Sequence, residues 1–174
     1  MSSPPDSIGF VFEDDLVRIT DLARSTRKNW VCNDLIEEPS DGRYREHHVI
    51  ATVAVGQLVR VVKRLGDVRR LWAASGDEII DAGVRLDAAG YLVAAVEPRT
   101  LRLTLARSDM ELGRALQPFE ATVAVPLAQS IVGAREAFWR FALTTDPPVD
   151  RRRRAARVKE VPPARVSPIM PDRA

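Results

Sequence analysis

Two short clusters of basic and polar side chains near the N-terminus could bind a nucleic acid. They are Arg27, Lys28 and Asn29 in the first cluster, and Arg43, Tyr44 and Arg45 in the second. Arginine and lysine read guanine or grip phosphate, and asparagine pairs with adenine, when a short helix presents them in the major groove. Arginines on either side of a tyrosine in a hairpin would meet the DNA backbone or the minor groove. Both clusters are therefore expected to contact duplex DNA.

Each cluster also has a purely structural interpretation. Arg27 and Lys28 could form a solvated helix face, and Tyr44 could pack the hairpin against the body of the domain. A lone tryptophan such as Trp30 is more often buried in a core than stacked on a base. The second cluster thus depends on its two arginines for any DNA contact.

The elements that must position these clusters are expected to be helical. Thr20 predicts a helix start, because threonine can cap a helix and Asp21 follows where the helix dipole favours negative charge. A second short helix is expected over Thr26–Cys32, with Asn33 ending it in the left-handed conformation.

A loop and two longer helices are expected to follow. The composition of Glu37–Gly42 is typical of a turn. Val49–Leu65 fits both strand alternation and a helical face, and its length favours a helix that Gly66 would end. Asp67–Ala74 is expected to form another helix.

The stretch Ile19–Leu65 resembles the winged helix-turn-helix DNA-binding domain of the MerR family of regulators. Ile19–Arg24 resembles the first helix, and Thr26–Trp30, followed by the apolar pair Leu35-Ile36, resembles the second. Gly42–Val49 with its Arg-Tyr pair resembles the wing. The resemblance implies a transcriptional regulator whose second helix and wing contact duplex DNA. Similar modules occur in phage excisionases, small terminase subunits and co-chaperone modulators, so this fold alone does not fix a function.

Beyond Gly83 the pattern changes to short strands. Hairpin strands are expected over Tyr91–Val96 and Thr100–Ala106, joined by a turn at 97–99. A helix over Met110–Leu116 and a third strand over Phe119–Val125 follow. Pro126 would then start a helix. That last helix carries an apolar seam suited to the domain's own sheet or to a second subunit, formed by Leu127, Ile131, Ala134, Phe138 and Phe141.

These segments predict an α+β protein. A flexible N-terminus (1–8) precedes a mostly helical winged helix-turn-helix domain (9–82). A small α+β module with a short antiparallel sheet (83–145) would mediate dimerisation or bind a partner. The segment 146–174 is rich in proline and arginine, so we expect a disordered basic tail whose run Arg151–Arg154 could touch nucleic acid or an acidic partner.

Composition excludes several classes of protein. The chain has 174 residues, 45% of them hydrophobic, and a net charge of +2, which is ordinary for a globular protein. It has no apolar run long enough to span a membrane and no secretory signal pattern, so a cytoplasmic protein is expected. With Cys32 as the single cysteine, a disulfide framework or a multi-thiolate metal site within one chain is excluded. No cofactor is expected.

Two other constellations could do chemistry. The adjacent His47 and His48 diverge on a helix, so they lack the spacing of a zinc-ligand pair, and no metal site is expected. The carboxylates Glu97, Asp109 and Glu111 could serve a nuclease or toxin-type enzyme only if they cluster. No nucleophile motif or phosphate-binding loop accompanies them, so no catalytic residue is assigned.

The leading hypothesis is a DNA-binding regulator that acts as a homodimer on two half-sites. An alternative is a protein-interaction module or adaptor that uses the winged-helix scaffold, with a protein partner held by the C-terminal module or the tail. The charge of Val17–Arg70 motivates this alternative, because its eleven basic residues face seven acidic ones and duplex-binding domains are usually more basic.

Overall fold

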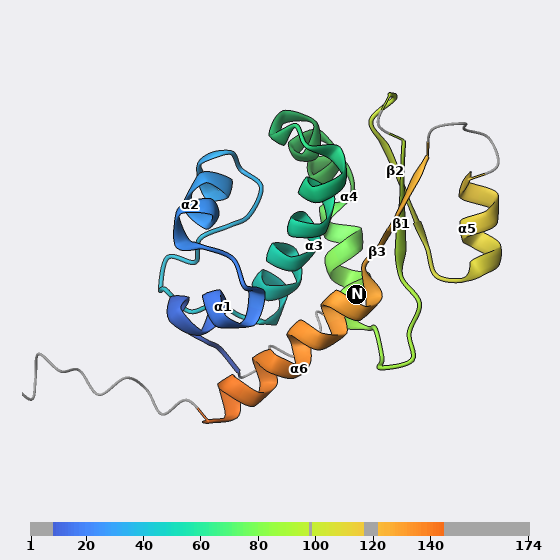
Figure 1. The fold of residues 1–174 in the computed structure, drawn as a ribbon. Coiled ribbons are helices and arrows are strands. Elements are labelled where there is room, and N and C mark those ends of the chain that lie inside the picture. Colours follow the sequence, from blue (N-terminus) through green and yellow to red (C-terminus); the bar gives the residue numbers. More distant parts are fainter. Residues whose placement is uncertain (1–8, 98, 117–121, 145–174) are drawn as a thin grey trace, which may run out of the picture. The chain divides into compact units, whose positions relative to one another are not determined.

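Helices and one small antiparallel sheet make up the part of the chain that the structure describes (Figure 1). The structure is a computed structural model and describes residues 9–97, 99–116 and 122–144. The N-terminal part is helical and the sheet follows it. The predicted α+β class is therefore confirmed. The expectations for 1–8, for Pro98 in the hairpin turn and for the tail lie outside the described residues.

The first two helices are α1 (Glu13–Thr20) and α2 (Arg24–Cys32). Three acidic residues occupy the first turn of α1, where the helix dipole favours them. Thr20 ends this helix instead of starting it, and its hydroxyl donates a hydrogen bond to the Leu16 carbonyl at 2.8 Å. Asp21 then adopts a left-handed φ of 49°, which stops the helix. The predicted helix start at Thr20 is therefore wrong.

The second helix begins two residues earlier than expected and ends at Cys32 as expected. Asn33 keeps a negative φ of −102°, and its backbone N–H donates to the Asn29 carbonyl at 3.1 Å. The left-handed residue is the next one, Asp34, with a φ of 52°. The prediction of a left-handed Asn33 therefore misses by one position.

The two longest N-terminal elements are α3 (Glu46–Val62) and α4 (Leu65–Val84), which pack side by side (Figure 1). A helix in the ambiguous 49–65 segment is confirmed, but it ends at Val62, because the next residue, Lys63, has a positive φ of 63°. Gly66 does not terminate a helix, because it lies in the first turn of α4. The helix expected over 67–74 lies within the first half of this longer one.

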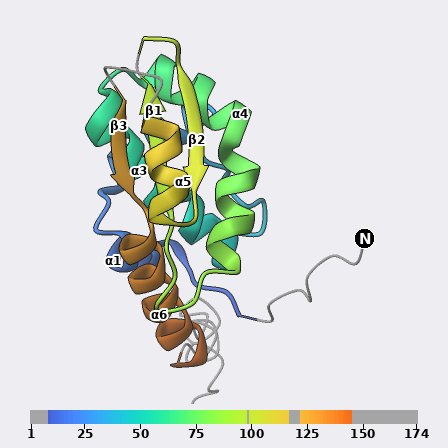
Figure 2. The ribbon, with the colours of Figure 1, turned by 90° about the vertical axis from the view of Figure 1, so that its right-hand side faces the viewer.

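The sheet has the order β2-β1-β3, with all neighbours antiparallel. Its strands are β1 (Val93–Glu97), β2 (Arg102–Ala106) and β3 (Val123–Pro126). All of β1 is buried, because α5 (Asp109–Leu116) covers one face of the sheet and α3 and α4 lie behind the other (Figure 2). Pro126 belongs to β3, so it does not start the last helix. Residues 119–121 of the predicted third strand are outside the described part.

The last helix, α6 (Ala128–Thr144), crosses back to the N-terminal elements and packs on α1 and α3 (Figure 1). Its apolar seam is used inside the chain: Ile131 and Phe138 are fully buried, and Phe138 shares a cluster with Val11 and Leu16. The seam is therefore packed mainly within the chain, with Phe141 half-buried at its end. The predicted boundary at residue 83 is not a boundary between two cores, because one apolar cluster contains residues from both sides of it.

A buried polar network connects α6 to the N-terminal helices. Arg135 of α6 donates from Nε to the Glu46 carboxylate at 2.6 Å, and Trp139 donates from Nε1 to the same oxygen at 3.1 Å. Arg135 also donates to the carbonyls of Gly83, at 3.1 Å, and Leu86 at the end of α4. Only 9% of the Glu46 side chain is exposed. This network thus connects the start of α3, the end of α4 and the middle of α6.

Replacing Arg135 by methionine should destabilise the fold, because the substitution leaves the Glu46 carboxylate buried with one donor. The expected loss is about 2–3 kcal/mol in the free energy of unfolding, below the 3–5 of a fully buried pair, since Arg135 is partly exposed. Urea denaturation measures it.

The double variant Arg135→Met with Glu46→Gln should lose less stability than Arg135→Met alone, because the carboxylate that would remain buried without its partner is no longer there. As a control, Arg85→Ala removes an exposed ion pair with Asp81 and should change stability by less than about 0.5 kcal/mol. If Arg135→Met changed the free energy of unfolding as little as Arg85→Ala, the network would not stabilise the contact of α6 with α3 and α4.

Candidate nucleic-acid interface

The helix α2 presents a polar face to solvent. It follows α1 after the three-residue turn 21–23, and its sequence allows one buried stripe and one exposed stripe. Arg27 and Trp30 point inward and are buried. The outward residues are Arg24, Ser25, Lys28, Asn29 and Cys32. Two of the predicted DNA-contacting side chains, Lys28 and Asn29, are therefore exposed to solvent. The side-chain oxygen of Asn29 accepts a hydrogen bond from Asn33 Nδ2 at 3.0 Å.

Arg27 does not share that exposure. Its guanidinium is 2% exposed and binds two carboxylates, Glu13 of α1 at 2.6 Å and Glu38 at 3.1 Å. The charged carbon also lies 5.3 Å from the ring centre of Tyr44. A side chain enclosed in this way cannot reach a base edge while its ion pairs persist. We therefore leave Arg27 out of the interface and assign it a positioning role.

The pKa shifts agree with this assignment. Burial lowers the pKa of Arg27, but the hydrogen bonds to Glu13 and Glu38 outweigh that effect and raise it overall. The hydrogen bond from Arg27 in turn lowers the pKa of Glu13. Burial raises the pKa of Tyr44. At neutral pH Arg27 is thus charged and bound to ionised Glu13, whereas Tyr44 keeps its proton.

The segment 37–45, here called the bridged loop, lies next to α2. Tyr44 and Val11 form a single antiparallel bridge, and each donates its backbone N–H to the other's carbonyl at 2.9 Å. Tyr44 is buried, with 3% of its surface exposed. Because neighbours in an extended segment point to opposite sides, burying Tyr44 turns Arg43 and Arg45 outward, and both are exposed.

Charges of both signs lie on the surface of the bridged loop. Arg43 lies over the Phe10 ring, with 4.7 Å between the guanidinium carbon and the ring centre, and its backbone N–H donates to the Asp41 carboxylate. Glu37 and Glu38 are also exposed. The exposed cations of the loop are therefore interspersed with carboxylates.

The structure brings the two predicted clusters together, but through their buried members. The contact between Arg27 and Tyr44 joins the middle of α2 to the base of the bridged loop. Lys28 and Asn29 stay exposed on the helix, and the two loop arginines stay exposed on the other element. Sequence reasoning missed Glu13 and Glu38 as the partners of Arg27, since no local pattern links acids 14 and 11 residues away to it.

His47 and His48 lie in the first turn of α3. His48 accepts a hydrogen bond from the Arg45 backbone N–H at its Nδ1 atom, at 3.0 Å, which satisfies one of the free donors at a helix N-terminus. Burial lowers the pKa of His48 to about 4. It also lowers the pKa of His47. Among the described residues no group of three or more side chains is arranged to hold a metal ion.

The three carboxylates weighed for catalysis do not meet. Glu97 pairs with Arg102 in the register of the hairpin and accepts a hydrogen bond from Thr100. Asp109 and Glu111 lie just past the opposite end of β2, and Glu111 accepts from the Arg107 backbone N–H at 2.6 Å. The length of a five-residue strand, about 13 Å between its end Cα atoms, separates the two places. The three carboxylates therefore do not form the cluster that a nuclease or toxin-type site would require.

Comparison with known proteins adds no assignment, because the sequence matches neither a known family nor a curated protein. Within residues 9–97, 99–116 and 122–144, no helix combines the length and apolar character that crossing a membrane requires.

The lowered pKa of His48 makes stability depend on pH. Between pH 6.5 and about 4 the unfolded chain binds a proton that folded His48 does not, so stability falls as the pH falls through this window. Replacing His48 by glutamine should reduce the loss of stability between pH 7 and pH 5 by about 1 kcal/mol. The effect is smaller than the full pKa shift would give, because solvent screens the half-buried imidazole. Urea denaturation at pH 7 and pH 5 measures the change.

Glutamine suits the position because it can accept the same Arg45 N–H, as at the third residue of a capping box. His47→Gln is the matched control and should flatten the profile less, since the pKa of His47 is lowered less than that of His48. Equal pH profiles for His48→Gln and the unsubstituted protein would contradict the assignment.

Proposed function

We propose that the protein binds duplex DNA, with α2 in the major groove and the bridged loop as a wing along the backbone. One observation carries the proposal: α2 presents Lys28 and Asn29 outward while its buried face is fixed to the base of a loop with two outward arginines. In this reading the protein is a regulator that contacts DNA, as its resemblance to MerR-type domains implies.

The dimensions of α2 suit this role. An α-helix with its side chains is about 10–12 Å in diameter, and the major groove of B-DNA is about 12 Å wide, so the nine-residue α2 can enter the groove. Asn29 offers the amide that pairs with adenine, and Lys28 can reach guanine or a phosphate. Specificity would then come from α2, whereas the bridged loop supplies contacts that position the protein.

The charge at this face sets the expected strength of binding. Arg24 pairs with Asp14, and Arg27 is enclosed. Lys28, Arg43 and Arg45 form no ion pair among the described residues and are the cations offered to phosphate. Three phosphate contacts predict a slope of about −3 when the logarithm of affinity is plotted against that of salt concentration. Binding to non-specific DNA should therefore be weak.

Replacing Arg43 and Arg45 together by alanine should weaken binding to a random-sequence duplex and reduce the salt slope by about 2, because each phosphate contact contributes about 0.9. Fluorescence anisotropy titrations at several salt concentrations measure both quantities. The substitution leaves Tyr44 and its backbone bridge in place, so the fold should be retained.

The matched control is Arg70→Ala with Arg99→Ala, which removes two exposed arginines from α4 and the β1–β2 connection. That variant should keep the original slope. An unchanged slope in the Arg43/Arg45 variant would remove the bridged loop from the interface. Equal losses in both variants would point to diffuse attraction without a defined face.

A protein partner is the second candidate function. The observation in its favour is the acidic side of the bridged loop, where Glu37, Glu38 and Asp41 are exposed. Retention of a stoichiometric protein partner, with no retention on heparin or DNA matrices, would favour it over DNA binding. A homodimer stays a prediction without an assigned surface, since the seam of α6 is used within the chain.

A further inference from the structure

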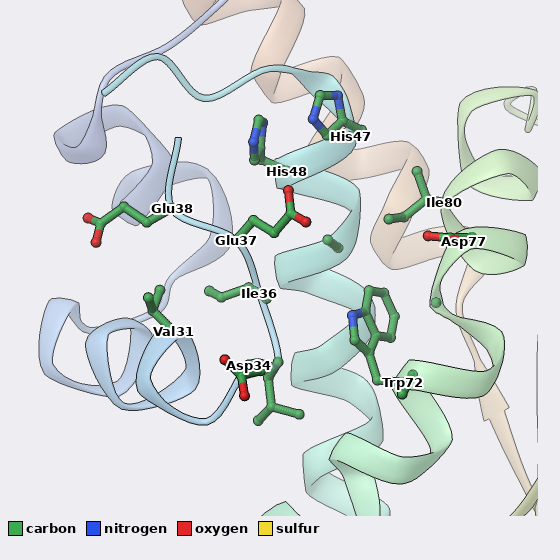
Figure 3. A pocket seen from close by; sticks show the side chains of 14 residues that line it. Val31, Asp34, Ile36, Glu37, Glu38, His47, His48, Trp72, Asp77 and Ile80 are labelled. Atoms are coloured by element: carbon green, nitrogen blue, oxygen red, sulfur yellow. The ribbon is translucent and has the colours of Figure 1, made fainter. Parts of the chain in front are cut away.

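A hollow of about 630 Å³ lies between the bridged loop, α3 and α4 (Figure 3). One wall is the chain from the end of α2 to the bridged loop, a second is the start of α3, and the third is α4. The hollow is lined by apolar side chains, two histidines and four carboxylates. Its volume is within the range of small-molecule sites.

Part of the lining is apolar and centred on Trp72. A methyl group built on Gly76 would come within 2.8 Å of the Trp72 indole atom Cε2, so the ring lies directly on the helix where a side chain is absent. Ile36 lines the wall across the hollow and Ile80 lies one turn further along α4 (Figure 3). The hollow therefore offers an aromatic ring and aliphatic surface to a ligand.

The charge of the lining is of one sign. It contains four carboxylates and neither lysine nor arginine. Asp34 is bound by Arg69 at 2.5 Å and Glu38 by Arg27 at 3.1 Å, both from outside the hollow. Glu37 and Asp77, which form no ion pair among the described residues, point toward each other from opposite walls (Figure 3).

The two histidines add no opposing charge. Burial lowers the pKa of both His47 and His48, so both imidazoles are neutral at pH 7. A neutral imidazole does not repel a cation, and the carboxylates of the hollow that form no ion pair among the described residues are Glu37 and Asp77.

We propose that this hollow binds a small organic cation that carries an apolar group, with the cationic centre between Glu37 and Asp77 and the apolar group against Trp72. A cation near an indole face gains a further attraction from the ring's negative π-surface. The site is separate from the outward face of α2, and its occupancy does not require DNA.

The probe is benzyltrimethylammonium, and its counterpart is phenylmethanesulfonate, which has a similar size and the opposite charge. Isothermal titration calorimetry on the full chain, without DNA, should show saturable binding of the ammonium compound and none of the sulfonate. Equal binding of both compounds, or of neither, would overturn the proposal.

Replacing Glu37 by glutamine together with Asp77 by asparagine should weaken binding of the ammonium compound about tenfold. Each carboxylate is partly screened by solvent and is expected to raise the affinity several-fold. The matched control is Glu78→Gln with Glu136→Gln, which removes two exposed carboxylates outside the hollow and should leave the affinity unchanged. Equal affinity in the two double variants would contradict the site.

A second variant fills the hollow without changing its charge. Ala73 is exposed on α4 and lines the cavity, so Ala73→Leu should retain the fold. The larger side chain should lower the affinity for the ammonium compound at least several-fold. Unchanged binding in this variant would show that the cation sits elsewhere on the acidic surface. Because these titrations contain no DNA, their failure and a failure of DNA binding are distinguishable.

Discussion

A single buried guanidinium organises the N-terminal part of this protein. Arg27 joins three segments, since it binds Glu13 at the start of α1 and Glu38 in the bridged loop while it projects from α2 itself. A charge held away from water needs such partners, and they fix where α2 and the loop can lie. The outward direction of Lys28 and Asn29 follows from the inward direction of Arg27, because these neighbours occupy different sides of one helix.

The last helix, α6, stabilises this arrangement. The helix α6 packs on α1 and α3, and Arg135 binds the carboxylate at the first residue of α3, to which the bridged loop leads. The hollow proposed for an organic cation uses the same framework, since its walls are the bridged loop, α3 and α4. A ligand there would contact the inner side of the loop that presents Arg43 and Arg45.

Sequence reasoning located the elements whose signals are local and missed those set by distant partners. The amphipathic pattern of 49–65 predicted a helix, and alternation along 102–106 predicted a strand with one half-buried face. The start at Thr20 failed because threonine can also bind a carbonyl in the last turn of a helix, as it does with Leu16. The exposure of Lys28 and Asn29 was compatible with the pattern, but the burial of Arg27 depends on Glu13 and Glu38, whose proximity arises only from the fold.

The most direct test of the account maps where duplex DNA contacts the protein. Backbone amide chemical shifts of the full chain, recorded by nuclear magnetic resonance during titration with duplex DNA, report each contact separately. DNA binding through α2 and the bridged loop predicts shifts that concentrate in these two elements, Lys28, Asn29 and Arg43–Arg45 included, with the amides of β2 and α5 unchanged. Shifts confined to the tail beyond residue 144, or to the sheet, would contradict it.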